Sequence, residues 1–164
     1  MEVEICGDYY SGKALMDKFD EIARSAFYNN DQKSLDIMWY LFYGKQSPIF
    51  GKSQFSYFEN IFIEDEALRK EIYNPYYKLS NEEEIADMIL DEFGVTGARR
   101  RIVNGHVPVK TKKGELPIKA KGKVYVIDGG ISKPYQEKTG IAGYTLVFNS
   151  HAVSLACLLY TSPS

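Results

Sequence analysis

The sequence has few cysteines and no long apolar run, and each shortage excludes a class of protein. Its two cysteines, Cys6 and Cys157, are too few for a disulfide framework and are not spaced as a metal knuckle. No apolar run approaches the roughly 18 residues that a membrane-spanning helix needs. The N-terminus also lacks the basic and apolar regions of a signal peptide. We therefore expect a cytoplasmic protein that uses no thiol chemistry and has no membrane partner.

The charge is close to balanced overall but is divided unevenly along the chain. The 164 residues, 45% hydrophobic and 26% charged, suit a soluble globular protein of about one domain. Residues 1–93 carry 9 basic and 19 acidic side chains, whereas residues 94–164 carry 11 basic and 3 acidic ones. Nine cations but only one anion, Glu115, lie within residues 99–123. This stretch is expected to attract anionic ligands where it is exposed.

Hydrophobic spacing divides the chain into a helical and a β-rich part. Apolar residues recur at helical spacing or beside stop signals in four early segments, which we expect to be helices: 13–28, 33–43, 55–62 and 82–93. After Gly94, short β-like runs are separated by glycine: 101–103, 107–109, 123–127 and 144–149. We therefore predict an acidic, mainly helical segment over 1–95 and a basic, β-rich segment over 96–153.

The periodicity also predicts which helix faces are buried. In the helix over 33–43 the expected buried stripe is Leu35, Met38, Trp39 and Phe42. In the helix over 82–93 it is Ile85, Met88, Ile89 and Phe93.

Two polar loops follow predicted strands and contain the residues best placed for chemistry. Asn104, Gly105 and His106 follow one strand, and Asp128 follows another, with two glycines after it. A glycine before a histidine lets the backbone turn tightly and approach a ligand, and a neutral imidazole is a common metal ligand. Spacing alone favours an ordinary loop histidine, and for Asp128 it favours a turn cap over a ligand-orienting carboxylate.

A longer stretch of the sequence favours the functional interpretation of these loops. The string NGHVPVKTKKGELPIKAKGKVYVIDGGISKPYQEKTGIAGYTLVFNS over residues 104–150 closely resembles the C-terminal part of the class III, Firmicutes-type, fructose-1,6-bisphosphatases. The resemblance extends upstream through residues 36–52 and 74–79 and the helix before Gly94. That family belongs to the calcineurin-like metallophosphoesterases. The resemblance implies an α/β fold in which helices flank a sandwich of two mixed β-sheets.

The resemblance implies a specific role for His106. In this superfamily a Gly-His at a strand end supplies one imidazole to a two-metal centre, which the resemblance assigns to manganese. Many members have a second histidine two residues later, where this chain has Pro108. The Asp-x-His, Gly-Asp-x-x-Asp and Gly-Asn-His elements of the superfamily do not occur in this chain. We therefore expect the C-terminal part of a longer phosphatase, inactive by itself.

The implied reaction is hydrolysis of the 1-phosphate of fructose 1,6-bisphosphate in gluconeogenesis, with Lys110 and Lys133 as candidate phosphate contacts. For any one lysine a solvated hairpin with its tip at residues 112–115 is the favoured alternative. Another metallophosphoesterase, acting on phosphoproteins or dinucleoside polyphosphates, stays open. So does a non-catalytic anion-binding module. We expect no nucleic-acid partner, because the aromatic residues lie mainly in the acidic half.

The end of the chain departs from the family-like pattern. The string CLLYTSPS over residues 157–164 resembles the translation of a sequencing adapter. We expect residues 154–164 to be a non-native or disordered tail, with an apolar C-terminal strand as the alternative.

Overall fold

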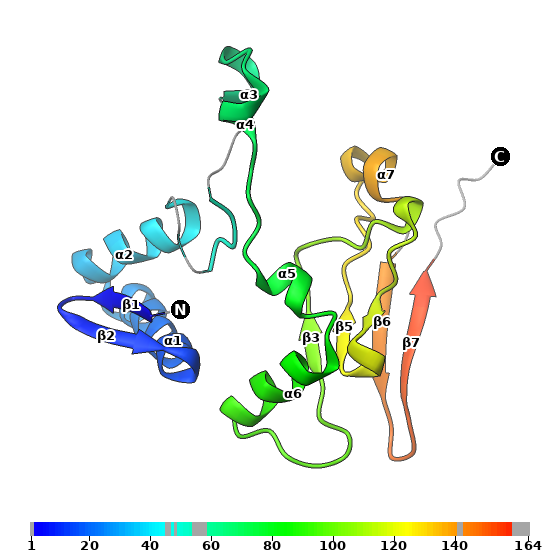
Figure 1. The fold of residues 1–164 in the computed structure, drawn as a ribbon. Helices are drawn as coiled ribbons and strands as arrows, with labels where there is room; N and C mark the ends of the chain where they lie inside the picture. The colour runs from blue at the N-terminus through cyan, green and yellow to red at the C-terminus, as the bar shows by residue number, and fades with distance from the viewer. Residues whose placement is uncertain (1, 45–46, 48, 54–58, 141–142, 159–164) are drawn as a thin grey trace. The chain divides into compact units, whose positions relative to one another are not determined.

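The structure is a computed structural model that describes residues 2–44, 47, 49–53, 59–140 and 143–158. The chain divides into two compact units, Met1–Tyr77 and Lys78–Ser164 (Figure 1). Among the described residues, no helix is long and apolar enough to cross a bilayer. The charge boundary predicted near residue 95 falls inside the second unit, and the domain division of the parent protein stays a prediction.

The first unit begins with a β-hairpin that the helical prediction missed. The strands β1 (Glu2–Ile5) and β2 (Asp8–Ser11) pair antiparallel, and Ile5 faces Asp8 across a two-residue turn. That turn consists of Cys6 and Gly7, with φ of 57° and 95°. Two successive positive φ values match the twist of a tight hairpin, and glycine adopts them readily. The available signal was the alternation of acidic and apolar residues before Gly7.

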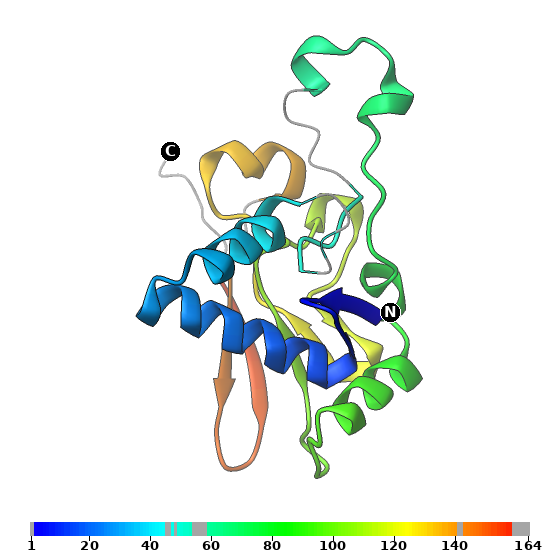
Figure 2. The ribbon, with the colours of Figure 1, turned by 90° about the vertical axis from the view of Figure 1, so that its left-hand side faces the viewer.

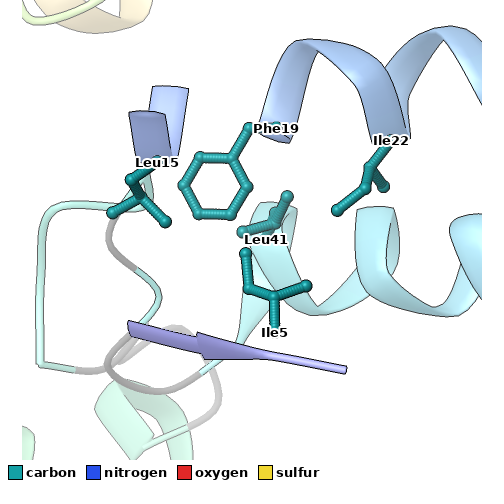
Figure 3. Packing of buried hydrophobic residues seen from close by; sticks show 5 residues of the cluster. All are labelled: Ile5, Leu15, Phe19, Ile22 and Leu41. Atoms are coloured by element: carbon teal, nitrogen blue, oxygen red, sulfur yellow. The ribbon is translucent and has the colours of Figure 1, made fainter. Parts of the chain in front are cut away.

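Two long helices pack against this hairpin and form the first core (Figure 3). Helices α1 (Gly12–Asn29) and α2 (Gln32–Tyr43) lie side by side in both views of the fold, and they confirm the predicted helices over 13–28 and 33–43 (Figures 1 and 2). The buried cluster contains one strand residue and side chains from both helices: Ile5, Leu15, Phe19, Ile22 and Leu41.

The predicted buried stripe of α2 is partly wrong. Leu41 is 3% exposed, whereas Trp39 and Phe42 are 69% and 71% exposed. Helix α2 thus packs on α1 through the neighbouring stripe that ends at Leu41, with Ile37 and Met38 partly buried against the core. Periodicity identified an amphipathic helix, but two adjacent apolar stripes were available and packing selected one of them.

Short helices complete the first unit. They are α3 (Glu59–Phe62), α4 (Glu66–Arg69) and α5 (Tyr76–Leu79), which crosses into the second unit. The helix predicted over 55–62 is therefore present at 59–62, and residues 54–58 lie outside the described residues.

A small mixed sheet forms the centre of the second unit. Its order is β3 (Ile102–Asn104), β5 (Val124–Val126) and β4 (Ile118–Lys119), with β3 parallel and β4 antiparallel to β5. Each residue of the central strand β5 is buried, and an unbroken apolar run is what a strand covered on both faces requires. The strands predicted over 101–103 and 123–127 are confirmed.

The strand predicted over 107–109 is wrong. Residues 107–109 form an irregular segment around Pro108, which lacks the N–H that a ladder needs. Two 3-10 helices lie in the connection, η1 (Thr111–Lys113) and η2 (Ala120–Gly122), so residues 112–115 are not the tip of a hairpin.

Helix α6 (Glu83–Glu92) confirms the helix predicted over 82–93 but presents a different face. Ala86 and Leu90 are buried, whereas the predicted core residues Met88 and Phe93 are 59% and 41% exposed. Ala86 packs against Ala120 and Val124. Small side chains at this contact let the helix approach the sheet closely.

In this orientation, carboxylates on the adjacent stripe of α6 form ion pairs with distant cations. Asp87 pairs with Lys123 and, at 2.7 Å, with Arg100, which also pairs with Asp91. Glu83 bridges Lys121 at 2.9 Å and Lys123 at 3.1 Å. We call these six residues the α6 ion-pair cluster. The Glu83 side chain in the first turn of α6 is therefore ion-paired.

The α6 ion-pair cluster predicts a loss of stability in acid. The hydrogen bond from Lys123, opposed by burial and reinforced by Arg100, holds the pKa of Asp87 below its ordinary value. Lys121 and Lys123 lower the pKa of Glu83 in the same way. A carboxyl whose pKa is lowered by folding stabilises the folded state above its unfolded pKa of about 4, and this contribution is lost as the pH falls through the folded value. We therefore expect the melting temperature to decrease when the pH is lowered below about 4.

The Asp87→Asn variant is expected to melt a few degrees lower at pH 7 and to lose part of that acid dependence. Glu84→Gln is the matched control, because Glu84 is an exposed carboxylate on the same helix. Equal melting temperatures for the two variants at pH 7 would contradict a stabilising role of the cluster.

The described part of the chain ends in an antiparallel ribbon. The strand β6 (Gly143–Phe148) confirms the strand predicted over 144–149, and it pairs with β7 (Val153–Leu158) from Gly143↔Leu158 to Phe148↔Val153 (Figure 2). A C-terminal strand is the alternative that the sequence left open for this segment. Residues 159–164 lie outside the described part of the chain. The fold is thus mixed α/β with small sheets.

Candidate functional site

The parallel pairing of β3 and β5 brings the two predicted site loops together. Asn104 ends β3 opposite Val126 of β5, and the N–H of Ile127 donates to the Asn104 carbonyl at 2.9 Å. The loop that starts with Gly105 and the loop that starts with Asp128 therefore leave the same edge of the sheet. The carboxyl ends of parallel strands are where α/β proteins commonly bind ligands.

His106 lies at the centre of a tight turn. Its φ is 67°, a left-handed value that is unfavourable for a side chain with a β-carbon. The N–H of Val107 donates to the Gly105 carbonyl at 2.8 Å across it, so His106 is the middle residue of a γ-turn. The imidazole is exposed. Backbone strain of this kind is concentrated at functional sites, where the surrounding structure maintains it.

Gly105 is the first residue of this turn, where the sequence predicts that the backbone bends tightly. Its own φ is not in the left-handed region. A β-carbon built on Gly105 meets no atom within 4 Å. The strained position is one residue later, at the histidine itself.

Asp128 caps the second loop. Its Oδ1 accepts a hydrogen bond from the N–H of Gly130 at 2.8 Å, the turn-capping role that the sequence favoured. Its carbonyl accepts from the N–H of Val109 at 2.9 Å. This second bond ties the segment after His106 to the loop after β5, so the two loops are joined by main-chain contacts at both ends.

A second layer of residues, which the sequence analysis missed, holds these loops. Gly130 has a φ of 68°, and a β-carbon built on it would lie 2.5 Å from Thr139 Oγ1 and 3.2 Å from Pro108 Cβ. Thr139 ends helix α7 (Lys133–Thr139), and its carbonyl accepts from the Thr111 hydroxyl at 2.7 Å. The available signals were the Gly-Gly pair after a strand and the Thr-Gly pair after a helix.

The two candidate substrate lysines lie on segments that contact each other through η1 and α7. Lys110 is exposed, and its N–H donates to Glu115 at 3.0 Å. Lys133 is exposed at the first residue of α7. The Lys112 ammonium joins η1 to α7 by donating to the Glu137 carbonyl at 3.0 Å.

Ion pairing reduces the number of cations in residues 99–123 that could attract an anionic ligand. Four of its nine cations pair with carboxylates: Arg100, Lys119, Lys121 and Lys123. The Lys119 ammonium lies 2.6 Å from the Glu115 carboxylate. Burial raises the pKa of Glu115, but the hydrogen bond from Lys119 outweighs it together with that from the Lys110 N–H, so the pKa is lowered overall.

The described residues do not by themselves fit a two-metal centre. Across residues 2–44, 47, 49–53, 59–140 and 143–158, no group of three or more histidine, cysteine, aspartate or glutamate side chains converges in a way that could hold a metal ion. His106 offers a single exposed nitrogen ligand, and a stable site needs several convergent ones.

Sequence comparison places the chain beside one group of enzymes. The family described as Firmicute fructose-1,6-bisphosphatase matches residues 1–161. A fructose-1,6-bisphosphatase class 3 of Bacteroides fragilis is 53% identical over 158 residues, which cover 93% of this chain and 24% of the relative. The corresponding protein of Fusobacterium nucleatum is 52% identical over 153 residues, covering 90% of this chain and 24% of the relative.

A third relative is matched over a similar share of its length. The fructose-1,6-bisphosphatase class 3 of Finegoldia magna is 54% identical over 152 residues, covering 90% of this chain and 23% of the relative. The chain therefore spans about a quarter of the length of these curated relatives. No solved structure matches it.

Proposed function

This chain belongs to the Firmicute fructose-1,6-bisphosphatase family, and on that basis we propose that it forms part of an enzyme that hydrolyses fructose 1,6-bisphosphate to fructose 6-phosphate and phosphate. The observation that carries the proposal beyond membership is the strained γ-turn at His106. An exposed imidazole held at the carboxyl end of a parallel strand is suited to contact a ligand. The cytoplasmic location stays a prediction from the sequence.

His106 is proposed as one ligand of the manganese pair that the family resemblance implies. A pair of divalent cations would supply a reactive hydroxide at neutral pH and would neutralise phosphoryl charge. The described residues offer no group that could hold a metal ion alone, so the remaining ligands are proposed to come from the rest of the enzyme. We also propose that the full enzyme forms the metallophosphoesterase sandwich of two β-sheets, and that the β3–β5–β4 sheet contributes to one of its two layers.

The remaining site residues are proposed to position the loop of His106 or to bind the substrate phosphate. Asp128 holds its loop through Gly130 and holds the segment after His106 through Val109. This arrangement ties the main chain after His106 to the loop after β5. Lys110 and Lys133 are proposed to contact substrate phosphate, because an exposed ammonium is a common phosphate partner.

The proposal is tested by substrate preference. A full-length enzyme that carries these 164 residues should hydrolyse fructose 1,6-bisphosphate with a kcat/KM at least about tenfold above that for p-nitrophenyl phosphate, a phosphoserine peptide or a dinucleoside tetraphosphate. Phosphate release is measured for each substrate at the same enzyme and manganese concentration. A sugar bisphosphate that is no better than the generic ester would contradict the proposal, and a preference for the peptide or the dinucleotide would move the enzyme to another metallophosphoesterase class.

A further inference from the structure

A cavity of about 600 Å³ opens at the start of β3. It is lined by the loop over residues 95–98, by three successive arginines and by apolar side chains that include Phe148 at the end of β6. Figure 1 shows the loop from α6 to β3 and the turn between β6 and β7 at the same end of the second unit, and a hydrogen bond from Arg99 to the Ser150 carbonyl at 2.7 Å joins them.

The cavity lies away from the His106 turn. Arg101 precedes the first residue of β3, whereas His106 follows the last one by two residues. A three-residue strand rises about 10 Å. The two features are therefore at opposite ends of the same strand.

Among the residues that the structure describes, two of these three arginines pair with no carboxylate. Arg24, Arg69 and Arg100 each pair with a carboxylate. Within the described residues, Arg99 and Arg101 make no ion pair and bond instead to main-chain carbonyls. Arg99 donates to Ser150, and Arg101 Nη1 donates to the carbonyls of Arg100 at 2.6 Å and Ala98 at 3.4 Å.

Arg101 also carries an unsatisfied donor. Its Nε is buried and has no hydrogen-bond partner in the part of the chain that the structure describes. Buried donors of this kind are rare in folded proteins, and they call for a specific explanation. A positive charge held on neutral carbonyls beside an open cavity would be stabilised by an anion in that cavity.

The lining defines the chemistry of the ligand. Guanidinium groups bind phosphate through paired, charge-assisted hydrogen bonds. Beside them, Val95, Val103 and Phe148 are 40%, 44% and 63% exposed and form an apolar wall suited to an organic group. The volume lies within the range of small-molecule sites.

We propose that this cavity binds a small organic phosphate ester, with Arg99 and Arg101 on the phosphate and Phe148 against the organic group. The site is additional to the one at His106 and does not depend on the phosphatase proposal.

The test uses phenyl phosphate and inorganic phosphate as probes, titrated calorimetrically into the 164-residue chain. Phenyl phosphate should bind in the millimolar range or tighter, and more tightly than inorganic phosphate. Arg99→Gln and Arg101→Gln should each weaken it roughly tenfold, whereas Arg99→Lys should weaken it less. Phe148→Ala should remove the preference for phenyl phosphate over inorganic phosphate.

Lys113→Gln is the matched control, since Lys113 is an exposed cation of the same unit outside the cavity and its loss changes the net charge equally. Its affinity for phenyl phosphate should be unchanged. Arg99 is exposed, so its variants keep the test valid even where Arg101→Gln fails to fold. Absence of binding by the unaltered chain, or equal losses in Arg99→Gln and Lys113→Gln, would overturn the proposal.

Discussion

Replacing His106 by alanine in a full-length enzyme that carries these 164 residues is expected to lower the turnover of fructose 1,6-bisphosphate by at least about 100-fold. Loss of an outer-shell partner of a metal ligand already costs 10–100-fold in affinity or activity, and loss of the ligand itself should cost no less. Bound manganese, measured by mass spectrometry of the dialysed enzyme, should fall together with the rate.

A second variant separates the imidazole from the turn that presents it. His106→Gly removes the ligand but relieves the strain at φ 67°, because glycine adopts positive φ without a steric penalty. It should therefore unfold at a higher urea concentration than His106→Ala, with an unfolding free energy that is larger by about 1 kcal/mol. The two variants should be equally inactive. His151→Ala, which removes the other histidine at an exposed position, should leave metal content and rate unchanged.

Retention of full metal content and full rate by His106→Ala would remove His106 from the metal site. Equal stability of the glycine and alanine variants would mean that the γ-turn at His106 is not strained. Each result bears on a different claim, because the first concerns the imidazole and the second the backbone.

Replacing Gly130 by alanine is expected to destabilise the second unit by about 2–4 kcal/mol. One part of this cost is the left-handed φ of 68°, which a β-carbon disfavours by 1–2 kcal/mol. The other part is overpacking, because the new methyl group would lie 2.5 Å from Thr139 Oγ1 and 3.2 Å from Pro108 Cβ. Thr139 is 2% exposed and has little room to move away.

The chain contains a matched control for the first part. Gly114 has a similar φ of 76°, and a β-carbon built on it meets nothing within 4 Å. Gly114→Ala should therefore cost only the backbone strain, about 1–2 kcal/mol. The difference between the two variants, measured by urea unfolding, gives the overpacking cost at Gly130. Equal costs would show that the Asp128–Gly130 loop does not pack tightly on the segment after His106.

Much of the secondary structure was predictable from local pattern. Helices α1, α2 and α6 follow the spacing of their apolar residues, and Gly94 ends the last of these with a φ of 67°. Strand β5 was visible as an apolar run bounded by lysine and aspartate. The β1–β2 hairpin was missed because two four-residue strands give a weak periodic signal.

Helix orientation could not be read from the sequence. The apolar residues of α6 form a broad stripe that several rotations about the helix axis would bury. In the orientation that the structure shows, the carboxylates of α6 pair with Lys121, Lys123 and Arg100, which lie 9 to 40 residues beyond them. Pairings between distant positions are set by tertiary contacts, and spacing within one helix carries no information about them.

By itself, the sequence determined the family, helices α1, α2 and α6, strands β3, β5 and β6, and the residues of the two site loops, because motifs and short-range periodicity are local properties. Only the tertiary structure decided that the loops after β3 and β5 share one edge, that the strain lies at His106 and not at Gly105, and which cations are already neutralised. These features depend on contacts between residues far apart in the chain, as when the main chain of Val109 meets that of Asp128. One of the two histidines of the sequence, His106, is thus held in a turn whose left-handed φ is unfavourable for a residue with a β-carbon.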